Sequence, residues 1–133
     1  MGFFGWSVEI RLRFVGQCGK AVWMKCFQQL LESNDLVYGG FSAGACVLSP
    51  SLRGIHLADK PENVPEGYPS EVIWEGIGLI SFYIIPHFRS PHPGSEAMEN
   101  VIAYYKKQKL PYHAIADGEV IVVDGESIEV VHR

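Results

Sequence analysis

Residues 38–47 read "YGGFSAGACV", a stretch in which one serine stands among small residues directly after an apolar run. Its centre, "GFSAG" at 40–44, matches the Gly-x-Ser-x-Gly pattern of a nucleophile elbow, where a strand turns sharply into a helix. The glycines let such a turn close, and the turn holds the Ser42 hydroxyl in an exposed position. A tight turn with a solvated serine would leave the same pattern, so both interpretations stay open at this point.

Both flanks of this serine predict the elements that an elbow needs. The run "DLVYGG" at 35–40 predicts a short buried strand, and "SAGACVLSP" at 42–50 predicts a short helix that a proline ends. Upstream, alternation of apolar and charged residues over 8–15 predicts a half-buried strand, and 21–33 predicts a helix. Downstream, 51–70 is rich in Pro, Gly, Asp and Glu and predicts a long surface loop.

The second half of the chain continues the alternation of strands and helices. The apolar run over 71–88 predicts one or two strands, and 112–116 predicts another. Between them a helix is predicted, with Ser95 as its N-cap, acidic residues in its first turn and lysines near its end. Asp124-Gly125 between two β-branched runs predicts a hairpin. This order predicts an α/β fold with a mostly parallel sheet covered by helices.

The composition is that of a globular protein of one domain. The chain has 133 residues, 47% of them hydrophobic and 20% charged, and its net charge of −4 argues against non-specific binding of nucleic acid. It has no apolar run of about 18 residues that would indicate a membrane span, and its first residues do not fit a signal peptide. Three cysteines, Cys18, Cys26 and Cys46, lack metal-ligand spacing and predict reduced thiols in a cytoplasmic protein. Neither a metal nor a cofactor is expected.

A serine nucleophile requires a base and an acid that orients the base. Five histidines are available: His56, His87, His92, His113 and His132. His87 stands out because it follows the most apolar run, "FYIIP", and side chains at the carboxyl ends of strands line the ligand crevice of α/β folds. Asp59 in the long loop and Glu75 before the "GIGL" segment are candidates for the acid, and the residues alone do not separate them.

Three separated blocks of the chain resemble one known family. They read "VYGGFSAGACVLSPSLRGI", "IWEGIGLISFYIIPHFRSPHP" and "PYHAIADGEVIVVDG". Together they resemble the dipeptidase E and cyanophycinase family of serine peptidases, within the class I glutamine amidotransferase-like superfamily, over about residues 36–131. The resemblance implies a flavodoxin-like three-layer α/β/α fold and a peptidase that uses no cofactor.

The same resemblance implies roles for individual residues. Ser42 would be the nucleophile and His87 the base, with Asp59 as the acid and Glu75 in reserve. The oxyanion hole would be formed by two backbone N–H groups. One belongs to Ala43, and the other to a glycine of an upstream Gly-rich loop, for which Gly16 is the match.

The N-terminal part of the chain departs from the family pattern. Residues 1–33 match poorly, the first βαβ units are missing, and "FVGQCGKAV" stands where the Gly-rich loop is expected. We therefore expect a single, partial peptidase domain over 1–133 that resembles the C-terminal part of a family member. Missing strands would leave sheet edges and apolar faces uncovered, so the chain would form a homodimer that covers them or be poorly stable.

The resulting hypothesis is a peptidase that cleaves short peptides, Asp-X dipeptides among them. Arg53 and Arg89 lie near the two catalytic blocks and could pair with a substrate carboxylate. The alternative is a catalytically impaired, truncated relative that acts as a binding or interaction domain. An α/β-hydrolase esterase is disfavoured by the short separation of Ser42 and His87, and a Cys46-centred amidotransferase because serine occupies the elbow.

Overall fold

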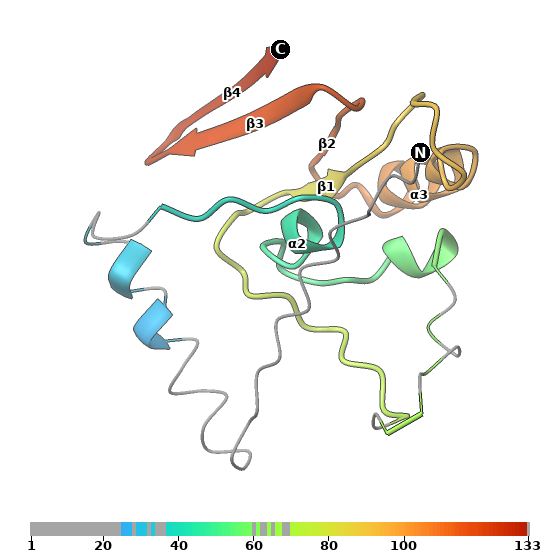
Figure 1. The fold of residues 1–133 in the computed structure, drawn as a ribbon, viewed down its shortest axis with the longest axis horizontal. Coiled ribbons are helices and arrows are strands. Elements are labelled where there is room, and N and C mark those ends of the chain that lie inside the picture. Colours follow the sequence, from blue (N-terminus) through green and yellow to red (C-terminus); the bar gives the residue numbers. More distant parts are fainter. Residues whose placement is uncertain are drawn as a thin grey trace, which may run out of the picture. The chain divides into compact units, whose positions relative to one another are not determined.

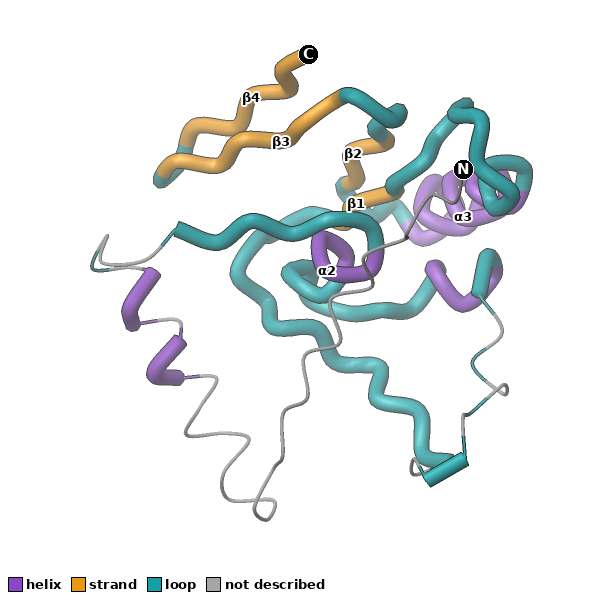
Figure 2. The backbone as a smooth tube through the Cα atoms, in the orientation of Figure 1, coloured by secondary structure: helices purple, strands orange, loops and turns teal. Residues whose placement is uncertain are grey.

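The structure is a computed structural model that describes residues 25–27, 29–31, 33, 37–59, 61, 64, 66–67 and 70–132. The chain divides into two compact units, Met1–Tyr38 and Gly39–Arg133. In the first unit, residues 25–27 and 29–31 are helical, which agrees with the helix predicted over 21–33 (Figure 2). The strand predicted over 8–15 lies outside the described residues.

A βαβ arrangement forms the centre of the second unit. Strand β1 (Tyr83–Ile85) pairs in parallel with β2 (Tyr112–Ala114), and helix α3 (Ala97–Gln108) lies between them in the chain (Figure 1). Parallel strands need such a crossover because no tight turn can join them. The helix buries one face against β1, and the core cluster comprises Ile85, Met98, Val101, Ile102 and Tyr105.

The N-cap of helix α3 lies one residue later than predicted. Its N-cap is Glu96, which makes no capping hydrogen bond with its side chain, and the predicted cap Ser95 instead accepts the Ser90 N–H at 3.1 Å. The chain thus uses the Ser95 hydroxyl to close the preceding loop. Lys109 ends the helix in the left-handed conformation, with φ of +56°. The predicted charge order is confirmed, because the first turn is acidic and the last is basic.

The predicted hairpin is confirmed. Strand β3 (Glu119–Asp124) pairs in antiparallel fashion with β4 (Ser127–His132), and Asp124 lies opposite Ser127 across a two-residue turn (Figure 1). Gly125 opens the turn with φ of +58°, a conformation that suits a residue without Cβ. Ile121 packs against a second apolar cluster formed by Ile80, Phe82 and Ile84.

Around the serine, only the helical half of the expected elbow is regular. Helix α2 (Ala43–Cys46) forms as predicted, but residues 37–40 form no regular strand. The apolar run over 71–88 contains one regular strand, β1. Its earlier part bonds to the segment after α2, with the Ile77 N–H donating to the Val47 carbonyl at 2.7 Å.

The described part of the predicted 51–70 loop contains one 3-10 turn, η1 (Ile55–Leu57). Gly54 precedes it with φ of +104°, and a Cβ at this position would lie 2.3 Å from the Tyr105 ring. The loop is therefore seated on helix α3 at one point. No described helix combines the length and apolar character needed to cross a bilayer.

Candidate active site

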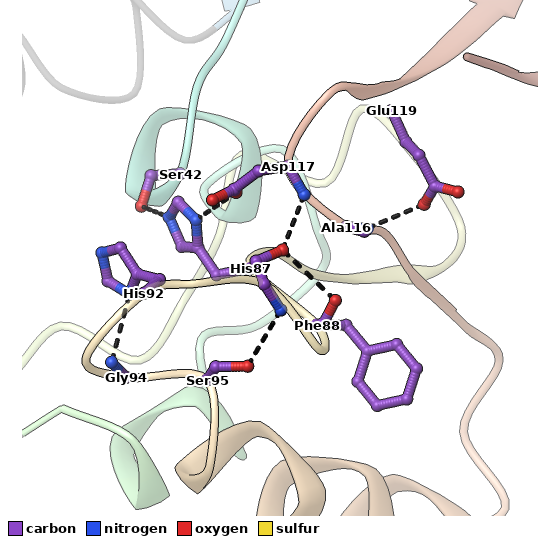
Figure 3. Close-up of polar contacts among 10 residues, drawn as sticks. Ser42, His87, Phe88, His92, Gly94, Ser95, Ala116, Asp117 and Glu119 are labelled. Carbon is purple, nitrogen blue, oxygen red and sulfur yellow. Dashed lines mark hydrogen bonds and ion pairs between the residues drawn. The ribbon is translucent and has the colours of Figure 1, made fainter.

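Ser42 occupies a strained position at the start of α2. Its backbone has φ of +51° and ψ of −119°, and its carbonyl accepts the N–H groups of Ala45 and Cys46. A positive φ is costly for a residue with Cβ, and such strain is concentrated at functional sites. The sharp turn at Ser42 directs the hydroxyl away from the helix and toward the imidazole ring of His87 (Figure 3).

His87 lies two residues beyond β1 and bonds through both ring nitrogens. Nε2 is 3.0 Å from the Ser42 hydroxyl, and Nδ1 is 2.6 Å from Oδ1 of Asp117 (Figure 3). A carboxylate accepts, so Nδ1 carries the proton, which leaves Nε2 free to accept from the Ser42 hydroxyl. His87 is 6% exposed and has φ of +57°. The three side chains therefore form a continuous hydrogen-bonded chain from hydroxyl to carboxylate.

The sheet brings Asp117 to this position. Backbone pairing continues past the strands, because the Ile115 N–H donates to Ile85 at 3.0 Å and the Phe88 N–H donates to Ile115 at 2.9 Å. The segments that carry His87 and Asp117 thus run side by side after the parallel strands. The Asp117 N–H also donates to the Ser90 hydroxyl at 2.7 Å, which joins the segment after β2 to the loop that follows His87.

Asp59 and Glu75, the two acids expected from the sequence, do not hold His87. Asp59 follows η1 as an exposed residue, and its N–H donates to Ile55. Glu75 is exposed and forms an isolated bridge with Ser51. The position expected for either acid is occupied by Asp117, which sequence reasoning missed. Asp117 follows β2, and only the pairing of β2 with β1 brings it beside His87.

Of the two expected oxyanion donors, the structure describes one. Ala43 is exposed at the first position of α2, directly after Ser42, and within the described residues its N–H has no acceptor. A free N–H in this place can point at the oxygen of a carbonyl that Ser42 attacks. Gly16, the second expected donor, lies outside the described residues.

The two arginines expected to bind substrate are both exposed. The Arg53 guanidinium lies 4.8 Å from the Trp74 ring centre, and that of Arg89 lies 4.8 Å from the Phe88 ring centre. Nε of Arg89 is also 3.6 Å from Oε1 of Glu99, and both side chains of this ion pair are exposed to solvent. Neither guanidinium contacts Ser42 or His87 in the described structure. Arg89 nevertheless lies only two residues beyond the proposed base.

Cys46 lies near the serine but has the surroundings of a structural thiol. It is 4% exposed, and its Sγ is 3.6 Å from the Ile84 carbonyl oxygen. Burial raises the pKa of the thiol to about 12, and the negative charge of Asp59 adds to this. A thiol that keeps its proton is a poor nucleophile, which speaks against chemistry centred on Cys46. The described residues also contain no cluster of His, Cys, Asp or Glu suited to a metal ion.

Comparison with known proteins identifies the family. The profile of peptidase family S51 matches residues 14–131, so the match begins inside the segment 1–33 that was expected to depart from the family pattern. A Drosophila melanogaster protein named "Probable alpha-aspartyl dipeptidase" is 31% identical over 74% of this chain and 40% of its own length. Peptidase E of Streptomyces coelicolor is 30% identical over 68% of this chain and 36% of its own length.

A solved structure shows the same fold. The crystal structure of a candidate peptidase E from Listeria monocytogenes has a TM-score of 0.61 at 19% identity, over 83% of this chain and 55% of the other. The likeness confirms the predicted α/β class. The chain spans about two-fifths of the length of the curated relatives described above. Since the family profile covers most of the sequence, this chain belongs to peptidase family S51.

Proposed function

We propose that this chain is a serine-type peptidase that hydrolyses short peptides. The observation that carries the proposal is the hydrogen-bonded chain from the Ser42 hydroxyl through His87 to the Asp117 carboxylate. Membership of a peptidase family supports it independently. In this proposal Asp117 takes the role that the sequence suggested for Asp59 or Glu75.

The arrangement supports covalent catalysis in two steps. His87 Nε2 takes the Ser42 proton as the hydroxyl oxygen attacks the peptide carbonyl carbon, and Asp117 stabilises the resulting imidazolium. The C–N bond then breaks while His87 gives that proton to the leaving amine, which leaves an acyl ester on Ser42. His87 then takes a proton from water as the water oxygen attacks the ester carbon. The ester C–O bond breaks, His87 returns the proton to the Ser42 oxygen, and the carboxylic acid product leaves.

The oxyanion of each tetrahedral intermediate requires donors fixed in advance. We assign the Ala43 N–H as one donor because it follows the nucleophile at the helix start. Gly16 remains the proposed second donor. Loss of a single such donor typically costs about 10²–10³ in rate, so the segment that contains Gly16 matters for the rate this chain reaches.

For the substrate we propose short peptides with an N-terminal aspartate. The name of the Drosophila relative, alpha-aspartyl dipeptidase, motivates this class. An exposed guanidinium suits a substrate carboxylate because it can form two parallel hydrogen bonds. Arg89 is the first candidate, since it lies two residues from His87, and Arg53 is the second.

Further proposals concern the whole protein. We propose that the α/β core belongs to a flavodoxin-like three-layer fold and that 1–133 is one partial domain of the family type. We also propose a cytoplasmic location. The two cysteines that the structure describes, Cys26 and Cys46, are free thiols, as a reducing compartment would keep them.

The test of the proposed function is hydrolysis of a panel of dipeptides, Asp-Leu and Ala-Leu included, by the wild-type chain and Ser42→Ala. We expect cleavage by the wild type that Ser42→Ala abolishes. A fluorophosphonate probe should label the wild type at Ser42, and peptide mapping should locate the adduct there. Folded wild-type protein that neither cleaves the panel nor reacts with the probe would contradict the proposal.

A second candidate function is peptide binding without cleavage. Calorimetry with Asp-Leu distinguishes the two candidates. Saturable binding by a wild type that does not react with the probe would favour the binding domain.

A further inference from the structure

A second histidine covers one face of the proposed base. The rings of His87 and His92 are stacked, with their centroids 3.9 Å apart and their planes 9° from parallel (Figure 3). On another side, the Phe41 ring meets His87 edge-on at 5.7 Å. His92 makes no hydrogen bond to Ser42 or Asp117 in the described structure, so it takes no direct part in the proton transfers above.

The loop after β1 holds His92 against His87. The His92 N–H donates to the Ser90 carbonyl at 2.7 Å, and its carbonyl accepts the Ser95 N–H at 2.9 Å. The Ser90 hydroxyl in turn accepts the Asp117 N–H. One short loop therefore fixes both His92, which stacks on His87, and Asp117, which bonds to Nδ1 of His87.

The hydrogen bond at the His92 ring defines its charge. Nδ1 is 3.1 Å from the Gly94 nitrogen, and a backbone N–H can only donate, so Nδ1 is an acceptor (Figure 3). The proton of this ring is therefore on Nε2, and the imidazole is neutral. His87 thus faces an uncharged aromatic ring, whose π electrons attract a cation held over its face.

We propose that His92 is a positioning residue for His87, an inference that rests on the proposed function. The stacked neutral ring fixes the plane in which His87 reaches Ser42 and Asp117. It also stabilises the imidazolium that exists only after Ser42 has lost its proton. Because this stabilisation arises in the transition state and not on substrate binding, His92 acts on kcat and not on KM.

Apart from Asp117, no charged group that the structure describes is placed to stabilise the His87 imidazolium, so the face of the His92 ring is the group that can do so. Asp117 bonds the edge of His87 from the loop after β2, and Arg89, from the same loop as His92, is directed to Glu99 and Phe88. In the described residues no other charged side chain bonds to either imidazole. Substitutions that keep or remove the aromatic face of His92 therefore test this inference.

The test compares His92→Phe with His92→Leu and His92→Ala, using Asp-Leu hydrolysis and the rate of fluorophosphonate labelling. Phe keeps an aromatic face, whereas Leu has a similar bulk without one, and both lose the bond to Gly94. We expect kcat and the labelling rate of His92→Phe to stay within about twofold of the wild type. His92→Leu and His92→Ala should lose about three- to tenfold in both, with KM unchanged.

Equal rates for the Phe and Leu variants would overturn the inference, as would a wild-type rate in His92→Ala. Thermal unfolding of each variant shows whether a loss of rate reflects a loss of fold, and the Phe and Leu pair remains informative if the alanine variant unfolds. Absence of labelling and cleavage in the wild type would instead overturn the proposed function itself, and this inference with it.

Discussion

At the scale of single residues, the site depends on which carboxylate faces His87. Asp117 bonds Nδ1 at 2.6 Å although its side chain is 43% exposed. Its main effect is therefore on the tautomer and orientation of the ring and less on the stability of the fold. An amide in its place could donate to Nδ1 and would favour the wrong tautomer for accepting the Ser42 proton.

We predict that Asp117→Asn lowers kcat for Asp-Leu by about 10³–10⁴ while the unfolding midpoint changes little. Asp59→Asn and Glu75→Gln are matched controls, since each removes one exposed carboxylate from elsewhere in the same unit. Both controls should keep activity within about twofold of the wild type. A loss in Asp59→Asn equal to that in Asp117→Asn would show that the geometry around His87 does not describe the working enzyme.

Cys46 gives a prediction about reactivity. Burial raises the pKa of its thiol to about 12, whereas Cys26 is exposed. Iodoacetamide at neutral pH should therefore modify Cys26 and leave Cys46 intact in native protein, as judged by mass spectrometry of the peptides. Modification of Cys46 at the rate of Cys26 would show that the packing between α2 and β1 opens readily.

The same thiol links stability to pH. The fold raises the pKa of the Cys46 thiol from its ordinary value of 9.0 to about 12, so the native state binds this proton more tightly than the unfolded chain does. The contribution is fully present below pH 9 and is lost as the pH rises toward 12. The difference in unfolding free energy between the wild type and Cys46→Ala should therefore shrink over that window.

At the scale of elements, the best predicted features were those with a local cause. Helix α3 has its charges ordered along the dipole, and the hairpin has an Asp-Gly turn between β-branched runs, so both could be located from the sequence. The strand expected over 35–40 could not be predicted from local signals alone, because a strand forms only when a neighbouring strand pairs with it. Asp117 was missed for the same reason, since its place depends on which strands are adjacent.

One glycine determines how the segment after α2 meets the segment before β1. A Cβ on Gly76 would lie 1.8 Å from the Ser49 carbonyl oxygen, which no backbone can accept without moving. We predict that Gly76→Ala destabilises the fold by about 1–3 kcal/mol or more in chemical denaturation. Because the segment after α2 continues from the helix that begins at Ala43, with the Val47 N–H donating to the Ala43 carbonyl, probe labelling at Ser42 should slow in the folded variant as well.

Gly39→Ala is the matched control for this substitution. Among the residues that the structure describes, nothing lies within 4 Å of a Cβ placed on Gly39, and its φ is not in the left-handed region. Its stability should be unchanged or raised by up to about 1 kcal/mol, because alanine restricts the unfolded chain. If Gly76→Ala behaved in the same way, the close approach of the two segments would not exist in solution.

At the scale of the whole molecule, the hairpin leaves apolar surface to be covered. Six of its side chains are 41–51% exposed: Val120, Val122, Val123, Ile128, Val130 and Val131. Within the described residues each of its strands pairs only with the other, so both outer edges are open. A two-stranded hairpin with open edges is marginal on its own and prone to pair with another chain.

We therefore predict that the protein is a homodimer in which a second copy covers the hairpin. Sedimentation velocity over a concentration series should show the dimer, and Val120→Lys with Val122→Lys should shift it to monomer, because each buried lysine would need a partner for its charge. Ala103→Lys adds the same charge on the exposed side of α3 and should leave the dimer intact. A wild type that stays monomeric throughout the series would mean that another part of the protein covers these side chains.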